Sequence, residues 1–352
     1  MHQERARYPS GRGYLAACTL GLPADVTRAA VRRDLDAWAS GTANAAGYSA
    51  SLERARGHAA TLLGARPDQV ATGSQASVFT ALAAASAPAG AEVLCVEGDF
   101  SSIVAPFLAR GDLHVRHVPL HVLADEITPA TWLVSTSLVQ SATGEIVDAG
   151  AVTSSARAAA ALLLLDTTQA TGWMPTTDLE ADLMICHAYK WLGAPRGAAF
   201  AAFSDRALAE LTPITAGWYS GADPWTSCYG PELHLAADAT RFDVSPAWHA
   251  WAGAEAALEL AASLDMAAVQ AHDVGLANAF RRRLELATSD SAIVTWTDAD
   301  GDDLAALTAA GITASGRAGR ARVAFHVWND DDDVDLAVRA LRPDRAGVLG
   351  RA

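Results

Sequence analysis

The feature of this chain that most constrains its fold is a series of short apolar runs in its first half, each separated from the next by a connecting segment. The runs cover residues 92–96, 113–118, 131–136 and 161–165. A run of this length without alternation is typical of a strand buried on both faces of a sheet. Such strands, joined by connectors, predict an α/β domain with a largely parallel sheet.

A smaller domain is expected after Pro231, where the pattern changes. Two helical stretches and three short strands follow, at residues 246–263, 266–286, 293–297, 312–314 and 322–328. A length of 352 residues is compatible with two domains, since domains average about 150 residues. We therefore expect a large domain over residues 15–240 and a small α+β domain formed by residues 1–14 and 241–352.

Charge and cysteine content exclude several classes of function. The net charge of −14 argues against a surface that binds nucleic acid or anionic membranes, which would need a basic face. The longest aliphatic run, residues 158–165, is too short to span a bilayer, and the N-terminus lacks the apolar core of a signal peptide. Four widely spaced cysteines indicate neither a disulfide framework nor a metal site. We expect a cytoplasmic protein with no metal.

A single lysine, Lys190, accompanies 25 arginines in this chain. Arginine replaces lysine in solvation and ion pairing, but its guanidinium stays protonated and cannot form a Schiff base. A lysine amine can, once a modest shift of its pKa releases the proton. The alternative is a drift of composition from lysine to arginine that left one residue by chance, so the neighbours of Lys190 decide between the two.

The surroundings of Lys190 meet the needs of an aldehyde cofactor that carries a pyridine ring and a phosphate. Such a cofactor needs an amine, a carboxylate for the ring nitrogen, an aromatic ring against its face and phosphate donors. Lys190 is the amine, and Asp166 follows an apolar strand and is a candidate for the carboxylate. His187 and Tyr189 flank the lysine as phosphate donors, and Phe100 follows another strand, where it can stack.

Two glycine-containing segments are weaker signals. Ser74 lies in Gly73-Ser-Gln-Ala-Ser77, between an apolar run and a helical one, and backbone N–H groups at a helix N-terminus bind phosphate. An N-cap serine after a turn glycine is the alternative. The segment from Gly11 to Ala16 matches the dinucleotide fingerprint formally, but no strand precedes it, so we exclude a dinucleotide site.

These residues resemble the class V aminotransferase group of pyridoxal-phosphate (PLP) enzymes, which includes cysteine desulfurases, kynureninases and isopenicillin N epimerase-like proteins. The resemblance covers residues 14–329, and its core is Asp166-x-x-Gln169…Lys190-Trp-Leu-x-x-Pro195-x-Gly197. It implies PLP as cofactor, an amino-acid substrate and a homodimer. It also implies PLP-dependent fold type I, in which a large domain with a mostly parallel mixed sheet is joined to a small α+β C-terminal domain.

The resemblance also implies a role for each matching residue. Asp166 would pair with the pyridine nitrogen, Gln169 with the phenolic oxygen, and Lys190 would form the Schiff base. Four positions match phosphate-binding residues of one subunit: Ser74, Gln75, His187 and Tyr189. Ser245 stands where the family has a threonine that reaches the neighbouring subunit's phosphate.

Four further residues complete the implied site. Phe100 resembles the stacking phenylalanine of kynureninases, and Gln140 belongs to a segment that lies under the cofactor. Arg322 matches the arginine that takes the substrate carboxylate. Trp218 resembles the epimerase-like branch of the family and is expected near the substrate and the partner subunit.

A missing cysteine argues against one reaction of this family, that of the desulfurases. Desulfurases carry a nucleophilic cysteine in the C-terminal region, whereas here that region reads Gly-Arg-Ala-Gly-Arg-Ala at residues 316–321 and the last cysteine is Cys228. The epimerase-like branch that the sequence resembles contains C–S lyases, and β-elimination needs only Lys190 as base and a good leaving group. The resemblance therefore implies a C–S lyase that performs β-elimination on a cysteine S-conjugate and releases a thiol, pyruvate and ammonia. An aminotransferase, an epimerase and a decarboxylating enzyme remain alternatives, as does a binding protein of this fold without catalysis.

Overall fold

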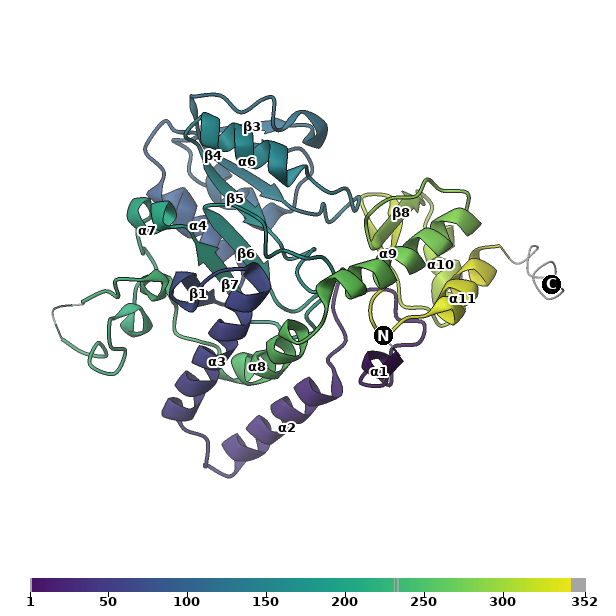
Figure 1. Cartoon of the computed structure of the whole chain (residues 1–352), viewed down its shortest axis with the longest axis horizontal. Helices are drawn as coiled ribbons and strands as arrows, with labels where there is room; N and C mark the ends of the chain where they lie inside the picture. The colour runs from purple at the N-terminus through teal and green to yellow at the C-terminus, as the bar shows by residue number, and fades with distance from the viewer. Residues whose placement is uncertain (1, 231, 233, 343–352) are drawn as a thin grey trace.

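A computed structural model describes residues 2–230, 232 and 234–342 and contains two β-sheets (Figure 1). The larger sheet has seven strands in the order β1-β7-β6-β5-β4-β2-β3. Its strands are β1 (Val70–Gly73), β2 (Glu92–Val96), β3 (His114–Val118), β4 (Thr131–Ser137), β5 (Leu162–Asp166), β6 (Leu183–His187) and β7 (Ala199–Phe203). Strands β2 to β6 pair in parallel, while β7 runs antiparallel to β1 and β6. The predicted α/β fold with a mostly parallel mixed sheet is confirmed.

The leucines of β5 show why this strand is central. All five residues of Leu162–Asp166 are buried. Because side chains alternate along a strand, Leu163 and Leu165 join the core cluster on one face of the sheet, while Leu162 and Leu164 join the cluster on the other face. The unbroken leucine run therefore contributes side chains to the hydrophobic core on both faces of the sheet, as expected for a strand covered on both sides.

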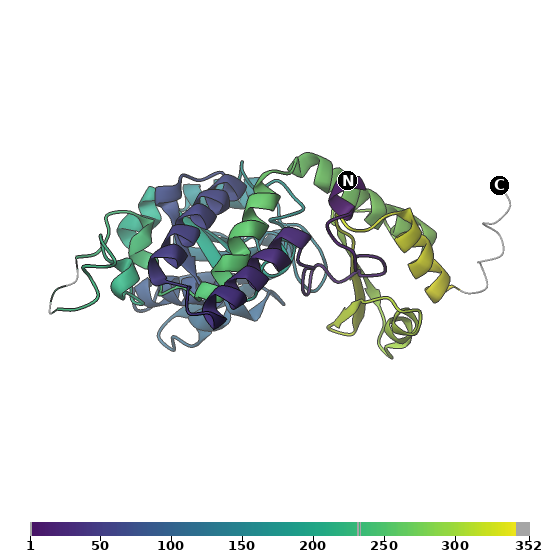
Figure 2. The ribbon, with the colours of Figure 1, turned by 90° about the horizontal axis from the view of Figure 1, so that it is seen from below.

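Helices cover both faces of the larger sheet and flank the smaller one (Figures 1 and 2). They are α1 (His2–Arg5), α2 (Asp25–Ala39), α3 (Ala45–Leu63), α4 (Ala76–Ser86), α5 (Ala105–Leu108), α6 (Ala149–Ala158), α7 (Asp205–Glu210), α8 (Trp248–Ala262), α9 (Met266–Arg283), α10 (Asp302–Ala309) and α11 (Asp331–Leu341). Helix α3 begins where the side chain of Asn44 accepts a hydrogen bond from the Gly47 N–H, and it ends at Gly64 in the left-handed conformation. These capping interactions define its length.

The smaller sheet is antiparallel, with the order β8-β10-β9. Its strands are β8 (Ile293–Thr297), β9 (Ser315–Arg317) and β10 (Arg320–Ala324). Residues 312–314, expected as a strand, precede β9, and Thr313 instead bridges to Tyr14 of the N-terminal segment. The domain boundary at residue 240 stays a prediction, and α8, beyond it in sequence, packs against α2 and α3 beside the larger sheet.

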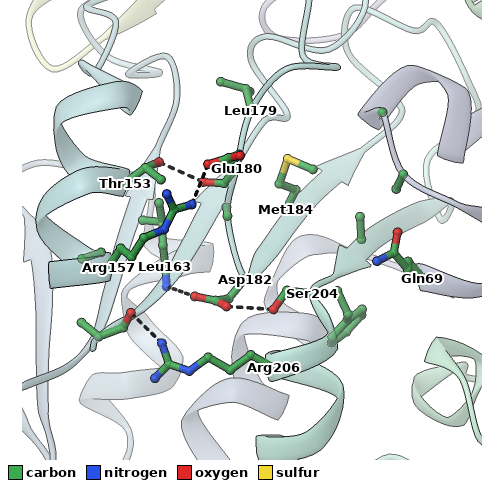
Figure 3. Close-up of a pocket in the computed structure, with 17 residues that line it drawn as sticks. Gln69, Thr153, Arg157, Leu163, Leu179, Glu180, Asp182, Met184, Ser204 and Arg206 are labelled. Carbon is green, nitrogen blue, oxygen red and sulfur yellow. Dashed lines mark hydrogen bonds and ion pairs between the residues drawn. The ribbon is translucent and has the colours of Figure 1, made fainter. Parts of the chain in front are cut away.

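A cavity of about 400 Å³ lies at the amino ends of β5 and β6 (Figure 3). Its polar groups bind one another: the carboxylate of Asp182 accepts hydrogen bonds from the Leu163 N–H and the Ser204 hydroxyl, and Arg157 pairs with Glu180 at 2.6 Å. It contains none of the predicted site residues. Within the described residues, no helix combines the length and apolarity needed to cross a membrane.

Candidate active site

The carboxyl ends of β4, β5 and β6 bring the predicted cofactor residues to one edge of the larger sheet. Ser137 at the end of β4 pairs with Asp166 at the end of β5, and Asp166 pairs with Ile185 near the end of β6. Parallel strands present the loops after their carboxyl ends on the same side, which is where α/β proteins bind ligands. The loop that follows β6 carries Lys190.

Lys190 is buried at this edge of the sheet, where the residue is 5% exposed. Burial lowers the pKa of its ammonium group to about 8, although the carboxylate of Asp166 opposes that shift. Its Nζ lies 5.1 Å from the centre of the Phe100 ring. A pKa this close to neutrality leaves an appreciable fraction of the amine unprotonated, so that it can act as a nucleophile or a base.

Hydrogen bonds from two glycines hold the backbone at Lys190. The Gly193 N–H donates to the Lys190 carbonyl oxygen at 2.9 Å, and the Gly21 N–H donates to the Tyr189 carbonyl at 2.9 Å. A Cβ atom at position 21 would lie within 1.7 Å of the Lys190 carbonyl oxygen. Glycine at this position therefore lets the N-terminal segment pass directly against the lysine.

Asp166 is a buried carboxylate with room for one more donor. Its Oδ1 accepts a hydrogen bond from the Thr168 N–H at 2.9 Å. Burial raises its pKa, while the contacts with Thr168 and the charge of Lys190 lower it. Among the described residues, Oδ2 is the oxygen left for a protonated ring nitrogen, and such a cation would offset the cost of burying the charge.

His187 has a buried nitrogen without a partner. Its Nε2 forms no hydrogen bond with the described part of the chain, and burial, together with the charges of Arg196 and Lys190, lowers the pKa of the ring to about 4. The ring lies edge-on to Tyr189 at 4.4 Å, and Arg196 lies over the Tyr189 ring at 4.8 Å. An orphaned buried nitrogen indicates a missing hydrogen-bonding group. A phosphate oxygen fits that need, so the site suits PLP.

The turn between β1 and α4 supplies the other predicted phosphate donors. Ser74 is half-buried and Gln75 is exposed. Gln75 is the N-cap of α4 and makes no side-chain capping bond. The Val78 N–H donates to the Gln75 carbonyl, which leaves the N–H groups of Ala76 and Ser77 at the start of the helix to bind an anion. Strand β1 is parallel to β6, because both are antiparallel to β7. The turn therefore opens at the same edge of the sheet as Lys190.

Gln169 is already engaged by protein groups. Its Oε1 accepts from the Trp191 indole N–H at 2.9 Å, and its Nε2 donates to the Cys18 carbonyl at 2.9 Å and to the Ser141 hydroxyl at 3.1 Å. An amide nitrogen has two hydrogens, so a bond to a cofactor oxygen would replace one of these two contacts. The predicted role of Gln169 stays a prediction.

Arg322 enters the site from β10 of the smaller sheet. It is 1% exposed, and its guanidinium donates only to neutral oxygens among the described residues: the hydroxyls of Thr19, Ser141 and Ser315 and the Ser141 carbonyl. Burial lowers its pKa. A buried cation without a carboxylate partner suits an anionic ligand, because charge-assisted bonds to one would replace neutral ones.

Asp99 is a site residue that sequence reasoning missed. Its carboxylate accepts from the Ser137 hydroxyl at 2.6 Å, from the Gln140 side chain at 3.1 Å and from the Phe100 N–H at 2.7 Å. It thereby ties the turn that holds Phe100 to the end of β4 and to Gln140. The available signal was an acidic residue directly before the aromatic one, just beyond the end of β2.

The structure does not bring Trp218 and Ser245 to Lys190. Trp218 lies in the turn Trp218–Ser220 and contacts Tyr219 and Trp225, with ring centres 4.4 and 5.5 Å away. Ser245 is exposed. Their predicted roles involve a second copy of the chain and stay predictions. Within the described residues, no group of three or more histidine, cysteine or acidic side chains could hold a metal ion.

The chain matches the family model "Aminotransferase class-V" over residues 35–316. It is 31% identical to a kynureninase from Deinococcus radiodurans over 262 residues, which cover 70% of this chain and 63% of the kynureninase.

Two solved structures show the same fold. The cysteine desulfurase CsdA from Escherichia coli superposes with a TM-score of 0.84, with 19% identity and 97% of each chain covered. The cystine C–S lyase C-DES superposes with a TM-score of 0.85, with 20% identity and 95% of this chain and 99% of the lyase covered. The architecture is therefore fold type I of the PLP-dependent enzymes, as predicted. By its sequence and its fold, the chain belongs to the class V aminotransferase family of enzymes, and its cofactor is pyridoxal phosphate.

Proposed function

We propose that this enzyme is a C–S lyase that performs β-elimination on a cysteine S-conjugate. The observation that carries the proposal is the position of Lys190, a buried amine with a pKa of about 8. The same site contains Arg322, a buried cation that has no carboxylate partner among the described residues. The hairpin of β9 and β10, where a desulfurase would place its nucleophile, contains no cysteine. Elimination needs a base and a leaving group but no second nucleophile.

Each residue then has a defined task. When bound, PLP supplies an electron-accepting ring that stabilises negative charge at the substrate's α-carbon. Arg322 binds the substrate carboxylate, Asp166 keeps the proton on the ring nitrogen, and Phe100 covers one face. The Nζ of Lys190 takes the α-proton. The electrons of the C–S bond leave with the sulfur, and the released unsaturated amine takes up water to give pyruvate and ammonia.

A panel of substrates tests this proposal. Cysteine S-conjugates are expected to yield equal amounts of thiol and pyruvate. An aminotransferase would yield another keto acid and no thiol, and an epimerase would only shift the optical rotation toward that of the equilibrium mixture, with neither product. Kynurenine belongs in the panel as a second candidate, because 31% identity to a kynureninase and the aromatic residue Phe100 favour it. Loss of kynurenine absorbance without thiol release from any conjugate would replace the first candidate by the second.

Replacing Arg322 by alanine is expected to weaken binding of α-carboxylate substrates by about 2–4 kcal/mol, because a charge-assisted pair in a desolvated site is lost. The measurement is the Michaelis constant. Arg317→Ala and Arg320→Ala are matched controls on the same hairpin, where both side chains are more exposed than Arg322. A larger effect at either control would move the carboxylate site to that residue.

Turnover is expected to survive replacement of all four cysteines by alanine or serine. Cys18, Cys95 and Cys186 are buried, and burial raises the pKa of the Cys95 thiol to about 12 and that of Cys186 as well. A thiol that stays protonated is a poor nucleophile, so no protein persulfide should form during the reaction. Mass spectrometry of the protein during turnover checks this. Detection of a protein persulfide, or loss of activity in a folded Cys228→Ala variant, would contradict this prediction and support a desulfurase reaction instead.

We also propose a homodimer in which Trp218 and Ser245 face the second copy. Ser245 is exposed, and the turn before it is fastened to β1, where the Val244 N–H donates to the Thr72 carbonyl. That attachment holds Ser245 at the surface of its own subunit, from which it can reach a partner. Light scattering is expected to give twice the mass of the chain. A fully active monomer would contradict the proposal.

A further inference from the structure

A buried acid–imidazole pair connects the smaller sheet to the loop that carries Lys190. Asp273 lies on α9 and His326 follows β10, and the two are 0% and 2% exposed. The Nδ1 of His326 lies 2.7 Å from an oxygen of Asp273, and its Nε2 lies 2.9 Å from the Trp191 carbonyl oxygen. Trp191 directly follows the lysine, so this imidazole binds the chain one peptide away from the reactive amine.

The proton positions in this contact follow from what each atom can do. A carbonyl oxygen only accepts, so Nε2 of His326 carries a hydrogen. The other ring nitrogen and Asp273 then share one proton, either as an ion pair or as a neutral pair, and both states keep the bond to Trp191. The second oxygen of Asp273 has no partner among the described residues. The bonding of this carboxylate is therefore directed at His326.

The same short segment also holds the carboxylate-binding cation. Arg322 lies on β10 and His326 comes just after that strand. On the other side of the contact, the Trp191 indole N–H donates to Gln169, so the residue held by His326 is also fixed to the loop after β5. Lys190 and Arg322 are therefore connected through the short segment from β10 to His326 and through the hydrogen bond from His326 to the Trp191 carbonyl.

We propose that Asp273 and His326 are positioning residues, which hold the Lys190 backbone at a set distance from Arg322 through the Trp191 carbonyl. The inference rests on the proposed roles of Lys190 and Arg322. The pair touches neither substrate nor cofactor and acts through the loop. Its importance follows from the steep dependence of reaction rates on geometry, since a misplacement of about 1 Å can reduce a rate a hundredfold.

Two replacements of His326 separate its two hydrogen bonds. A glutamine places its amide N–H near the position of Nε2 and can still donate to the Trp191 carbonyl, whereas an asparagine reaches only toward Asp273. Both are made in an Asp273→Asn background, which avoids leaving a lone buried carboxylate. Asp273→Asn alone is the control, because its amide can donate to Nδ1 of a neutral imidazole that still donates to Trp191.

Two measurements on the cofactor-free full-length protein report on the loop without requiring turnover. The first is the rate at which added PLP becomes fixed to Lys190 by borohydride. The second is hydrogen exchange of the Gly21 and Gly193 amides, which bind the Tyr189 and Lys190 carbonyls. The reference for both rates is the Asp273→Asn variant. The His326→Gln variant is expected to stay within about threefold of it in PLP attachment and in amide exchange. The His326→Asn variant is expected to attach PLP about tenfold more slowly and to exchange these amides about tenfold faster.

Equal values for the two variants, or the reverse order, would overturn the proposal, because a purely structural role would depend on the contact with Asp273 rather than on that with Trp191. If the asparagine variant does not fold, His326→Leu in the same background takes its place, since it leaves no polar group unpaired at position 326. If the parent protein fixes no PLP at Lys190, the proposed function fails, while the exchange rates still decide the positioning role.

Discussion

Lys190→Arg is expected to give a folded protein of unchanged net charge that has lost activity by roughly a thousandfold or more. The guanidinium stays protonated, so it can neither attack an aldehyde nor take a proton from the substrate. The measurement combines turnover with the visible absorbance of added PLP and with peptide mapping after borohydride. Because the chain has no other lysine, an adduct in the parent protein has only Lys190 or the chain terminus as its position.

Lys190→Ala provides the matched comparison. It also removes the amine, but it leaves space in which an added small amine can act as an external base. Partial rescue of the alanine variant by methylamine, with no rescue of the arginine variant, would assign the proton transfer to this position. An adduct mapped to the chain terminus, or an arginine variant that retains activity, would contradict the assignment of Lys190.

Asp166→Ala is expected to lower turnover by about a hundredfold or more with little change in the Michaelis constant. The carboxylate holds the proton that makes the ring an electron acceptor, so its loss raises the barrier rather than weakening substrate binding. PLP should also bind more weakly. Steady-state kinetics and equilibrium dialysis of the cofactor measure the two effects.

Asp166→Asn is the sharper variant, because it keeps an oxygen to accept from the Thr168 N–H and removes only the charge. Burial raises the pKa of Asp166, so a neutral amide relieves a cost of folding. We expect the cofactor-free asparagine variant to melt no lower than the parent while it loses turnover. Unchanged turnover would mean that another group protonates the ring nitrogen.

The parts of this molecule that could be predicted from sequence are those encoded by neighbouring residues. The leucine run that ends at Asp166 defines a buried strand, and the single lysine lies a few residues after the next strand, so the carboxyl edge of a parallel sheet brings them together. The end of α3 is encoded in the same local way, because Gly64 takes the left-handed conformation that ends a helix.

The parts that could not be predicted depend on contacts between residues distant in sequence. Strand β7 runs antiparallel between β1 and β6, and nothing in its own five residues specifies that direction. Asp99 becomes a site residue only because β2 and β4 are neighbours in the sheet. The contact of His326 with Trp191 joins segments 135 residues apart, and a lone histidine in an apolar stretch gives no sign of its partner.

The path of the N-terminal segment has a consequence for the order of events during synthesis. Leu15 accepts from the Ala324 N–H and donates to the Thr313 carbonyl, and the Gly13 N–H donates to Asp333. Residues 13–15 therefore leave the ribosome before residues 313–333, with which they form these bonds, have been made. Arg322 lies among these later residues, so the site still lacks its buried cation when Lys190 has already been made. The larger sheet can form while translation continues, but the enzyme becomes competent only after β10 and the residues that bind the N-terminal segment have been made.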